Sequence, residues 1–246
     1  MKGTVLILGA SSAIARATAA AFAARGYGLY LAGRDDEELV RDAADLTIRY
    51  QVPVATGRFD AEAFDTHPAF IEQVIEASGQ LAGVVAAFGY LGEQARAAHE
   101  WDETLAIIQR NYTGAVSLLN LCANRMEQAG RGFIVGIASV AGDRGRQSNY
   151  TYGSAKGAFA LYLQGLRNRL AASGVTVLTV KPGFVDTGMT FGLPGMFLVA
   201  SPQYVGERIA RATERGRDVL YVPWFWRYIM LIITHIPERI FKRLKL

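Results

Sequence analysis

Two tyrosines and a lysine lie close together in the segment "YTYGSAKGA" at residues 150–158. Tyr152 and Lys156 are four residues apart, so on a helix they share one face, whereas Tyr150 points away from the lysine. An ammonium group beside a phenol stabilises the phenolate and lowers the tyrosine pKa, which makes the phenol an acid–base group near neutral pH. Ser139, which ends the apolar run "FIVGIAS", is placed to hold a carbonyl oxygen. This spacing predicts proton transfer to or from a substrate oxygen.

The elements that must position these groups follow from alternating apolar and amphipathic stretches. Short apolar runs flanked by glycine are typical of strands in a parallel sheet that helices cover on both faces. We expect strands at 4–9, 28–33, 55–59, 83–89, 132–139 and 174–183, and helices near 13–25, 36–51, 62–78, 100–129, 152–172 and 202–215. The alternation predicts right-handed crossovers and a doubly wound α/β sheet. The fold expected is a single Rossmann domain over residues 1–223, with a mostly parallel seven-stranded sheet, followed by an amphipathic basic tail over 224–246.

The first predicted strand–loop–helix, "LILGASSAIARATAAAF", has the features of a dinucleotide site. Gly9 ends the strand, Ser11 and Ser12 offer hydroxyl groups, and the helix begins near Ala13 and Ile14. A helix N-terminus carries free N–H groups and a partial positive charge, which favour a pyrophosphate. Alanines, Ala13 and Ala15, replace the second and third glycines of the usual pattern, and a methyl at Ala13 would crowd the phosphate. A tight turn without a ligand is the alternative.

The segment "LAGRDD" bears on the choice of cofactor. An acidic residue at the end of the second strand would bind the adenosine ribose hydroxyls and favour NAD. Gly33 and Arg34 occupy that place, and the arginine fork suits a 2′-phosphate. We therefore expect NADP(H), the alternative being a solvated Arg34. Asp35 and Asp36 are expected to cap the following helix.

With these residues in place, the chain resembles the short-chain dehydrogenase/reductase family over nearly all of residues 1–223. The motifs that carry the resemblance are "GASSAIA", Arg34, Asp60 in "RFDA", Asn111 in "RNYTG", Ser139, Tyr152, Lys156 and "KPGFVDT" at 181–187. The resemblance implies that Asn111, Ser139, Tyr152 and Lys156 act in catalysis. It adds Gly89, Pro182 and Thr187 to the cofactor-binding residues, with Thr187 near the carboxamide, Asp60 at the adenine and Lys156 at the nicotinamide ribose.

Asn111 would also kink its helix and hold a water that relays protons through Lys156. The alternatives are that Asp60 is a helix cap, that Asn111 is a buried polar residue and that "PG" is an ordinary turn. The segment "AAFG" at 86–89 departs from the family, because an asparagine that usually braces the sheet is absent. "VVAAFGYLGEQ" is more similar to reductases of a keto-pentose carried by polyprenyl phosphate.

The tail, "PWFWRYIMLIITHIPERIFKRLKL", is expected to form two helical pieces separated at Pro237. One face is expected to hold Phe225, Ile229, Ile232, Ile233, Ile236 and Ile240, and the other Arg227, His235, Glu238, Arg239, Lys242 and Lys245. The apolar stretch is too short to span a bilayer. It fits either a membrane interface or a contact with a partner subunit, and the basic cluster favours anionic lipid.

Composition excludes several classes of protein. The tail accounts for the whole net charge of +4, so the body is neutral and nucleic-acid binding is not expected. The lone Cys122 rules out an internal disulfide and suits the cytoplasm. His67, His99 and His235 are too far apart to suggest a metal site. The segment 187–199 has the glycine-hinged apolar character of a substrate lid.

The function expected is an NADPH-dependent oxidoreductase that interconverts a carbonyl and a secondary alcohol. Its substrate would be a small-molecule or lipid-linked carbonyl compound of apolar character. We expect a homodimer or homotetramer in the cytoplasm, with peripheral association at the inner face of the membrane if the tail binds lipid. The alternative is a non-catalytic nucleotide-sensing protein, or a membrane-docked scaffold, of the same fold.

Overall fold

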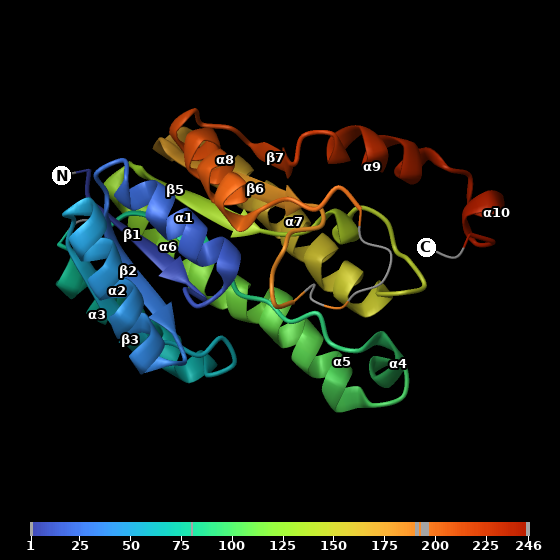
Figure 1. The fold of residues 1–246 in the computed structure, drawn as a ribbon, viewed down its shortest axis with the longest axis horizontal. Coiled ribbons are helices and arrows are strands. Elements are labelled where there is room, and N and C mark those ends of the chain that lie inside the picture. The colour runs from blue at the N-terminus through green and yellow to red at the C-terminus, as the bar shows by residue number, and fades with distance from the viewer. Residues whose placement is uncertain (1, 80, 190–191, 193–196, 245–246) are drawn as a thin grey trace.

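Parallel strands form the centre of the molecule (Figure 1). The structure is a computed structural model that describes residues 2–79, 81–189, 192 and 197–244. Within these residues the sheet has seven strands in the order β3-β2-β1-β4-β5-β6-β7, and every neighbouring pair is parallel. The strands are β1 (Thr4–Leu8), β2 (Gly28–Gly33), β3 (Val54–Arg58), β4 (Leu81–Ala86), β5 (Gly132–Ile137), β6 (Val175–Pro182) and β7 (Val219–Val222). The predicted doubly wound sheet is confirmed, and it is wholly parallel.

The strand β7 has no counterpart among the predicted strand ranges. It contains only four residues at one edge of the sheet, and Val219 is 45% exposed. Its apolar residues run directly into the apolar tail after Pro223, so they do not stand out as a separate strand. The other six strands fall within two to three residues of their predicted ranges.

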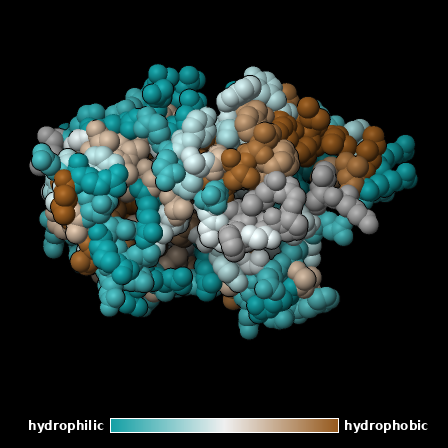
Figure 2. Space-filling view, in the orientation of Figure 1, coloured by the Kyte–Doolittle hydropathy of each residue, from teal (hydrophilic) through white to brown (hydrophobic). Residues whose placement is uncertain are grey.

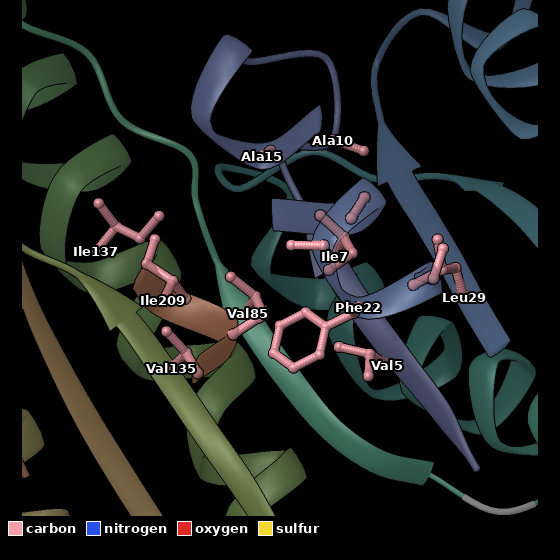
Figure 3. Close-up of a cluster of buried hydrophobic side chains, with 14 of the residues drawn as sticks. Val5, Ile7, Ala10, Ala15, Phe22, Leu29, Val85, Val135, Ile137 and Ile209 are labelled. Atoms are coloured by element: carbon pink, nitrogen blue, oxygen red, sulfur yellow. The ribbon is translucent and has the colours of Figure 1, made fainter. Parts of the chain in front are cut away.

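Helices cover both faces of the sheet. Figure 3 shows one face, where Phe22 and Ile209 pack over Val5, Val85 and Val135. The helices of that face are α1 (Ala13–Ala23), α2 (Asp36–Tyr50) and α8 (Pro202–Glu214). The other face carries α3 (His67–Ser78), α6 (Gly114–Ala129) and α7 (Tyr150–Leu170).

The long helix predicted over 100–129 is divided into three parts. It consists of α5 (Trp101–Ile108), a π-helical turn at Gln109–Thr113 and α6. Asn111 lies within this turn, where the backbone departs from regular α-helix, as the family resemblance implied. Such turns are frequent at functional sites. The short helix α4 (Gln94–Ala97) precedes α5 and was not predicted.

The tail forms α9 (Trp226–His235) and α10 (Glu238–Phe241), with Pro237 between them as expected. Its apolar residues do not share a single face, because Ile232 and Ile240 are exposed whereas Trp226 and Met230 are buried. The helix is apolar on most sides, so the protein covers one stripe and leaves another in contact with solvent. Among the described residues, no helix is both long and apolar enough to cross a bilayer.

Candidate active site

A cavity of about 950 Å³ opens at the carboxyl edge of the sheet. It lies where the strand order reverses between β1 and β4, which is the usual ligand position in open α/β sheets. One wall is the N-terminus of α1, from Ser11 to Ile14. A second wall joins the turn after β5 to the start of α7, and a third comes from α9. The cavity is thus long enough to bring a helix N-terminus and the predicted acid–base group to one ligand site.

The second wall brings Ser139, Tyr152 and Lys156 together. Ser139 lies close enough to Tyr152 to lower the pKa of the phenol. Lys156 Nζ lies 6.0 Å from the centre of the Tyr152 ring and donates to the carbonyl oxygen of Ile137 at 2.9 Å. Tyr150 is 49% exposed and is not among the residues that line the cavity. The four-residue spacing therefore selects the tyrosine that the fold places beside the lysine.

Glycines allow the turn after Ser139 to pack directly on α7. This turn is a 3₁₀ helix at Val140–Gly142, and Ser139 caps it by accepting from the amide N–H of Ala141 at 3.1 Å. A Cβ on Gly157 would lie 2.8 Å from the carbonyl oxygen of Gly142, and a Cβ on Gly153 would lie 2.8 Å from that of Ala141. The small residues of "YTYGSAKGA" thus set the approach of Ser139 to Tyr152.

Asn111 lies behind the cavity and not on its surface. Its Nδ2 donates to the carbonyl oxygens of Tyr90 at 2.6 Å and Ile107 at 2.8 Å, and its Oδ1 accepts from the N–H of Tyr90 at 3.2 Å. A Cβ on Gly89 would meet Asn111 Oδ1 at 2.7 Å and Lys156 Nζ at 3.2 Å. Asn111 therefore fixes the chain after β4 against Lys156, and its direct bonds are to backbone groups.

The expected lowering of the Tyr152 pKa by Lys156 is wrong for this structure. Burial raises the pKa of Tyr152 to about 12, and the hydrogen bond with Ser139 opposes this shift. Burial also lowers the pKa of Lys156 to about 8. The Lys156 ammonium donates a hydrogen bond to the Ile137 carbonyl. Burial of the phenol has a larger effect on the pKa of Tyr152 than the charge of Lys156. At neutral pH the tyrosine is a neutral phenol and the lysine is an ammonium.

The wall at α1 has the properties of a phosphate cradle. Ser12 caps the helix by accepting from the N–H of Ala15 at 3.2 Å and reaches across to the Ala87 carbonyl at 3.3 Å. Gly9 has φ +77°, and a Cβ there would lie 2.7 Å from the Cβ of Phe88. The first-turn N–H groups of a helix have no intrahelical acceptors. Ala15 is buried in the core, so the missing third glycine leaves the cradle unchanged, whereas Ala13 lines the cavity.

The predicted site residues divide between the cavity and its surroundings. The residues that line the cavity are Ser11, Ser12, Ala13, Ile14, Gly89, Ser139, Tyr152, Lys156, Pro182 and Thr187. Gly9, Arg34, Asp60 and Asn111 are not among its lining residues. Arg34 is exposed just beyond the end of β2, while Asp35 caps α2 by accepting from the Glu38 N–H at 3.0 Å. Asp60 accepts from the N–H of Glu62 at 3.0 Å within a turn, so it does not cap a helix as the alternative had it.

The sequence reasoning missed the wall that α9 provides. Trp226, Ile229 and Ile233 line the cavity at the positions of one helical stripe. A Cβ on Gly183 would lie 1.8 Å from Trp226 Nε1, so the indole packs against the chain that follows β6. This wall could have been predicted from the apolar residues at 226, 229, 230 and 233, because spacings of three, four and seven residues place side chains on one face of a helix.

Gln94 was also missed. Its side chain accepts from the N–H of Thr151 at 2.8 Å and donates to the Thr151 hydroxyl at 3.1 Å, which ties the chain after β4 to the start of α7. Six of the 13 residues of the predicted lid, 190–191 and 193–196, lie outside the described residues, as does Lys245 of the basic cluster. Thr187, Met189 and Phe197, at the two ends of that segment, line the cavity.

His67 is buried next to Asp60. Its ring nitrogens contact Ser117 Oγ at 2.8 Å and the carbonyl oxygen of Asp60 at 3.0 Å. Within the described part of the chain, no cluster of histidine, cysteine and acidic side chains has the makings of a metal site.

The sequence model described as short chain dehydrogenase matches residues 3–194. The chain belongs to the short-chain dehydrogenase family. It is 36% identical to an uncharacterized oxidoreductase of Mycobacterium tuberculosis over 98% of this chain and 96% of the relative. It is 35% identical to one from Streptomyces coelicolor, over 98% and 95%. A short-chain dehydrogenase from Sphingobium yanoikuyae in complex with NADPH has a similar structure, with a TM-score of 0.82, 26% identity and 96% of both chains covered.

Membership of the short-chain dehydrogenase family confirms the class of enzyme predicted from Tyr152 and Lys156. The chain is an oxidoreductase of the type that uses a nicotinamide cofactor and acts on a carbonyl or its alcohol. The family also confirms the fold class.

Proposed function

We propose that the protein is an NADPH-dependent carbonyl reductase. The observation that carries the proposal is one cavity with a helix N-terminus at one end and the Ser139–Tyr152–Lys156 group at the other. The cradle at Ser11–Ile14 suits the cofactor pyrophosphate, and Lys156 with Thr187 would hold the nicotinamide end. The similar Sphingobium yanoikuyae enzyme is described with NADPH, which supports this choice. Ketone-dependent NADPH oxidation tests the proposal, and its absence across a broad panel would favour the nucleotide-sensing alternative.

In this proposal Ser139, Tyr152 and Lys156 each have a separate role at the substrate oxygen. Bound NADPH supplies the hydride that reduces the carbonyl carbon. Ser139 donates a hydrogen bond that orients the oxygen and stabilises its growing negative charge. Tyr152 gives that oxygen a proton, and Lys156 stabilises the phenolate that remains. Asn111 holds the chain at Tyr90 so that Gly89 stays against Lys156. Because burial raises the pKa of Tyr152, at neutral pH the phenol is in the protonated form that donates in the reduction.

The lowered pKa of Lys156 predicts a decline of activity with pH. Its ammonium is present below a pKa of about 8 and is lost above it, so kcat/KM for NADPH should fall as pH rises through that value. The pKa of Lys156 in the folded chain lies below the ordinary lysine value of 10.5, so the unfolded chain binds more protons between the two values. This group therefore makes folding more favourable as pH rises there. Its titration therefore cannot cause the decline by unfolding the protein.

Initial rates from pH 6 to 10 measure this profile. In Lys156→Arg the guanidinium stays charged throughout this range, so any activity that remains should not fall near pH 8. A wild-type profile that is flat from pH 7 to 9.5 would remove Lys156 from the proposed role.

The preference for NADPH is proposed to depend on Arg34. A charged hydrogen bond contributes about 1.5–3 kcal/mol, so Arg34→Ala should raise KM for NADPH roughly 10–100-fold. KM for NADH should change less than about threefold, since NADH has no 2′-phosphate for the arginine to bind. Arg41→Ala, a change at an exposed arginine of α2, is the matched control. Equal losses with both cofactors would contradict the NADP assignment.

The substrate is proposed to be apolar over much of its surface, which suits a lipid-linked carbonyl compound. Apolar side chains form the part of the cavity between Tyr152 and α9, where they exclude water from the reacting carbonyl. They are Leu91, Val140, Phe184, Phe197, Ile229 and Ile233. Bulky hydrophobic ketones should therefore have lower KM values than small polar ones. The homodimer or homotetramer remains a prediction, measurable by light scattering.

We further propose that the outer face of α9 binds an anionic membrane surface. Trp224, Tyr228, Leu231 and Ile232 are 56–68% exposed, and Figure 2 shows apolar residues gathered over this helix. A second cavity, of about 1030 Å³, lies between α8, β7 and α9. Its basic lining residues are Lys181, Arg208, Arg211, Arg215, Arg217 and Arg227. Exposed apolar groups beside cations match the acyl chains and headgroups of anionic lipid.

Flotation with vesicles that contain phosphatidylglycerol tests this second proposal. The full chain should float with these vesicles and not with pure phosphatidylcholine, and salt should weaken the binding. Leu231→Glu with Ile232→Glu should abolish flotation, whereas Ile48→Glu, at a position 78% exposed on α2, should not. If the wild type does not float and the double variant instead dissociates a dimer, the face binds a second copy of the chain.

A further inference from the structure

Arg146 lies in the loop between Ser139 and α7 and lines the same cavity as Tyr152. Its Nε is buried and has no hydrogen-bond partner. Its Nη2 contacts Met230 Sδ of α9 at 3.4 Å. No acidic side chain of the described residues forms an ion pair with it. A guanidinium has five N–H donors, so most of those on Arg146 are available to a ligand.

The neighbouring charged residues are engaged elsewhere. Arg144 donates to the Thr234 carbonyl oxygen at 2.8 Å and pairs with Glu238 at 2.7 Å. Asp143, the nearest acid in the sequence, is hydrogen-bonded to Lys181 and to the Tyr221 hydroxyl at 2.8 Å. The Arg146 side chain is therefore partly buried, and no carboxylate of the described residues forms an ion pair with it. Burial lowers the pKa of Arg146, and the nearby charge of Asp143 opposes this shift only in part.

Two further polar atoms in the cavity lining lack partners. Asn149 Oδ1, three residues after Arg146, and Trp226 Nε1 are both buried without a hydrogen bond. The side chain of Asn149 does not cap α7, although the residue occupies the cap position. Native proteins leave few buried polar atoms unsatisfied, and those that remain call for an explanation such as a missing ligand. Three of them belong to residues that line one cavity, and we call Arg146, Asn149 and Trp226 its polar corner.

The cofactor phosphates do not account for this corner. They would bind at α1, which follows β1, whereas Arg146 follows β5, two strands away in the sheet. Neighbouring strands are about 4.8 Å apart, so the two positions are separated by roughly 10 Å in this direction. Ser139, Tyr152 and Lys156 lie on the β5 side with Arg146, together with α9. The polar corner belongs to the part of the cavity that remains for the substrate.

We propose that Arg146 binds an anionic oxygen group, a phosphate or a carboxylate, on the carbonyl substrate. Asn149 accepts a hydrogen bond from a hydroxyl group beside that anion. The apolar walls hold the remainder, so the substrate is an amphiphilic carbonyl compound. This inference rests on the proposed function for the carbonyl, but the anion-binding role of Arg146 stands or falls by itself.

Calorimetry on the full chain saturated with NADPH measures that role without turnover. The probes are hexyl phosphate, hexanoate and hexanol, which share one apolar chain. Wild type should bind at least one of the anions more tightly than hexanol. Arg146→Gln should weaken that anion at least about tenfold and leave hexanol unchanged, because only the charged hydrogen bonds are lost. Arg131→Gln, the same change at an exposed arginine at the far end of β5, should alter neither.

The pattern of binding identifies the anion and keeps the proposal separate from the redox chemistry. Binding of hexyl phosphate alone indicates a phosphorylated substrate, and binding of hexanoate alone indicates a carboxylate. Tyr152→Phe should bind the anion as wild type does. Anion binding by Arg146 can therefore be measured even in a variant without catalytic activity. Arg146→Lys should keep part of the affinity, and Arg146→Met should raise Tm, since it removes a partly buried charge that forms no ion pair. Equal binding of the anion by wild type and Arg146→Gln, or no anion binding by wild type, would overturn the proposal.

Discussion

Tyr152→Phe is expected to lower kcat for NADPH-dependent ketone reduction by about 10²–10⁴-fold, the usual contribution of a positioned general acid. The change removes one oxygen atom and leaves the ring in place on α7. Ser139 and Lys156 keep their bonds to Ala141 and Ile137, so Kd for NADPH should stay within about threefold of wild type. Stopped-flow single-turnover rates and fluorescence titration with NADPH measure the two quantities separately.

Tyr150→Phe provides the matched control, because it removes the same atom from a tyrosine two residues away. Tyr150 is 49% exposed and outside the cavity lining, so its loss should leave kcat within about twofold, as for most surface substitutions. Retention of wild-type kcat by Tyr152→Phe would remove Tyr152 from the proposed role. Equal losses in the two variants would show that the phenols act through folding and not through proton transfer.

Gly157→Val is expected to lower kcat by about 10²-fold, because a shift of about 1 Å in a reacting group has an effect of this size. The added Cβ would lie 2.8 Å from the Gly142 carbonyl oxygen, and this neighbour is backbone that cannot rotate away. The turn at Val140–Gly142 must move off α7, and Ser139 caps that turn. The substitution therefore separates Ser139 from Tyr152 without altering either side chain. Overpacking should also reduce the free energy of unfolding by about 1–3 kcal/mol.

Gly165→Val is the control for the effect of valine itself within α7. No atom lies within 4 Å of a Cβ built on Gly165, so kcat should be unchanged there. Urea titration of both variants shows how much of each change is stability, and kcat is then compared at a temperature where both are fully folded. Wild-type kcat in folded Gly157→Val would show that the close packing of this turn does not set the site.

The alternation of apolar runs and amphipathic stretches was sufficient to predict the sheet and its principal helices. Parallel strands buried on both faces stand out as continuous apolar runs, and the carboxyl ends of such strands must meet at one edge. The four-residue spacing of Tyr152 and Lys156 then identified the wall that holds them. The edge strand β7 and the helix α4 were not predicted, since each has only four residues and β7 runs directly into the apolar tail at Pro223.

The remaining features depend on tertiary contacts that no local pattern contains. The tail is apolar around most of α9, so its periodicity could not show which stripe faces the protein. The structure buries Trp226 and Met230, and it thereby places α9 against Arg146 and the cavity. The pKa of Tyr152 also required the structure, because it depends on how deeply the phenol is buried. The sequence spacing identified Lys156 as the neighbour of Tyr152, but it could not show how deeply the Tyr152 phenol is buried.

Deuterium transfer from NADPH labelled with two deuterium atoms at nicotinamide C4 is the most direct test of the central claim. The full chain is incubated with this cofactor and a panel of hydrophobic ketones, and the products are examined by mass spectrometry and NMR. We predict alcohols that carry one deuterium at the former carbonyl carbon, formed by wild type and not by Tyr152→Phe. Alcohol without deuterium at that carbon, or equal labelled product from both proteins, would contradict the account.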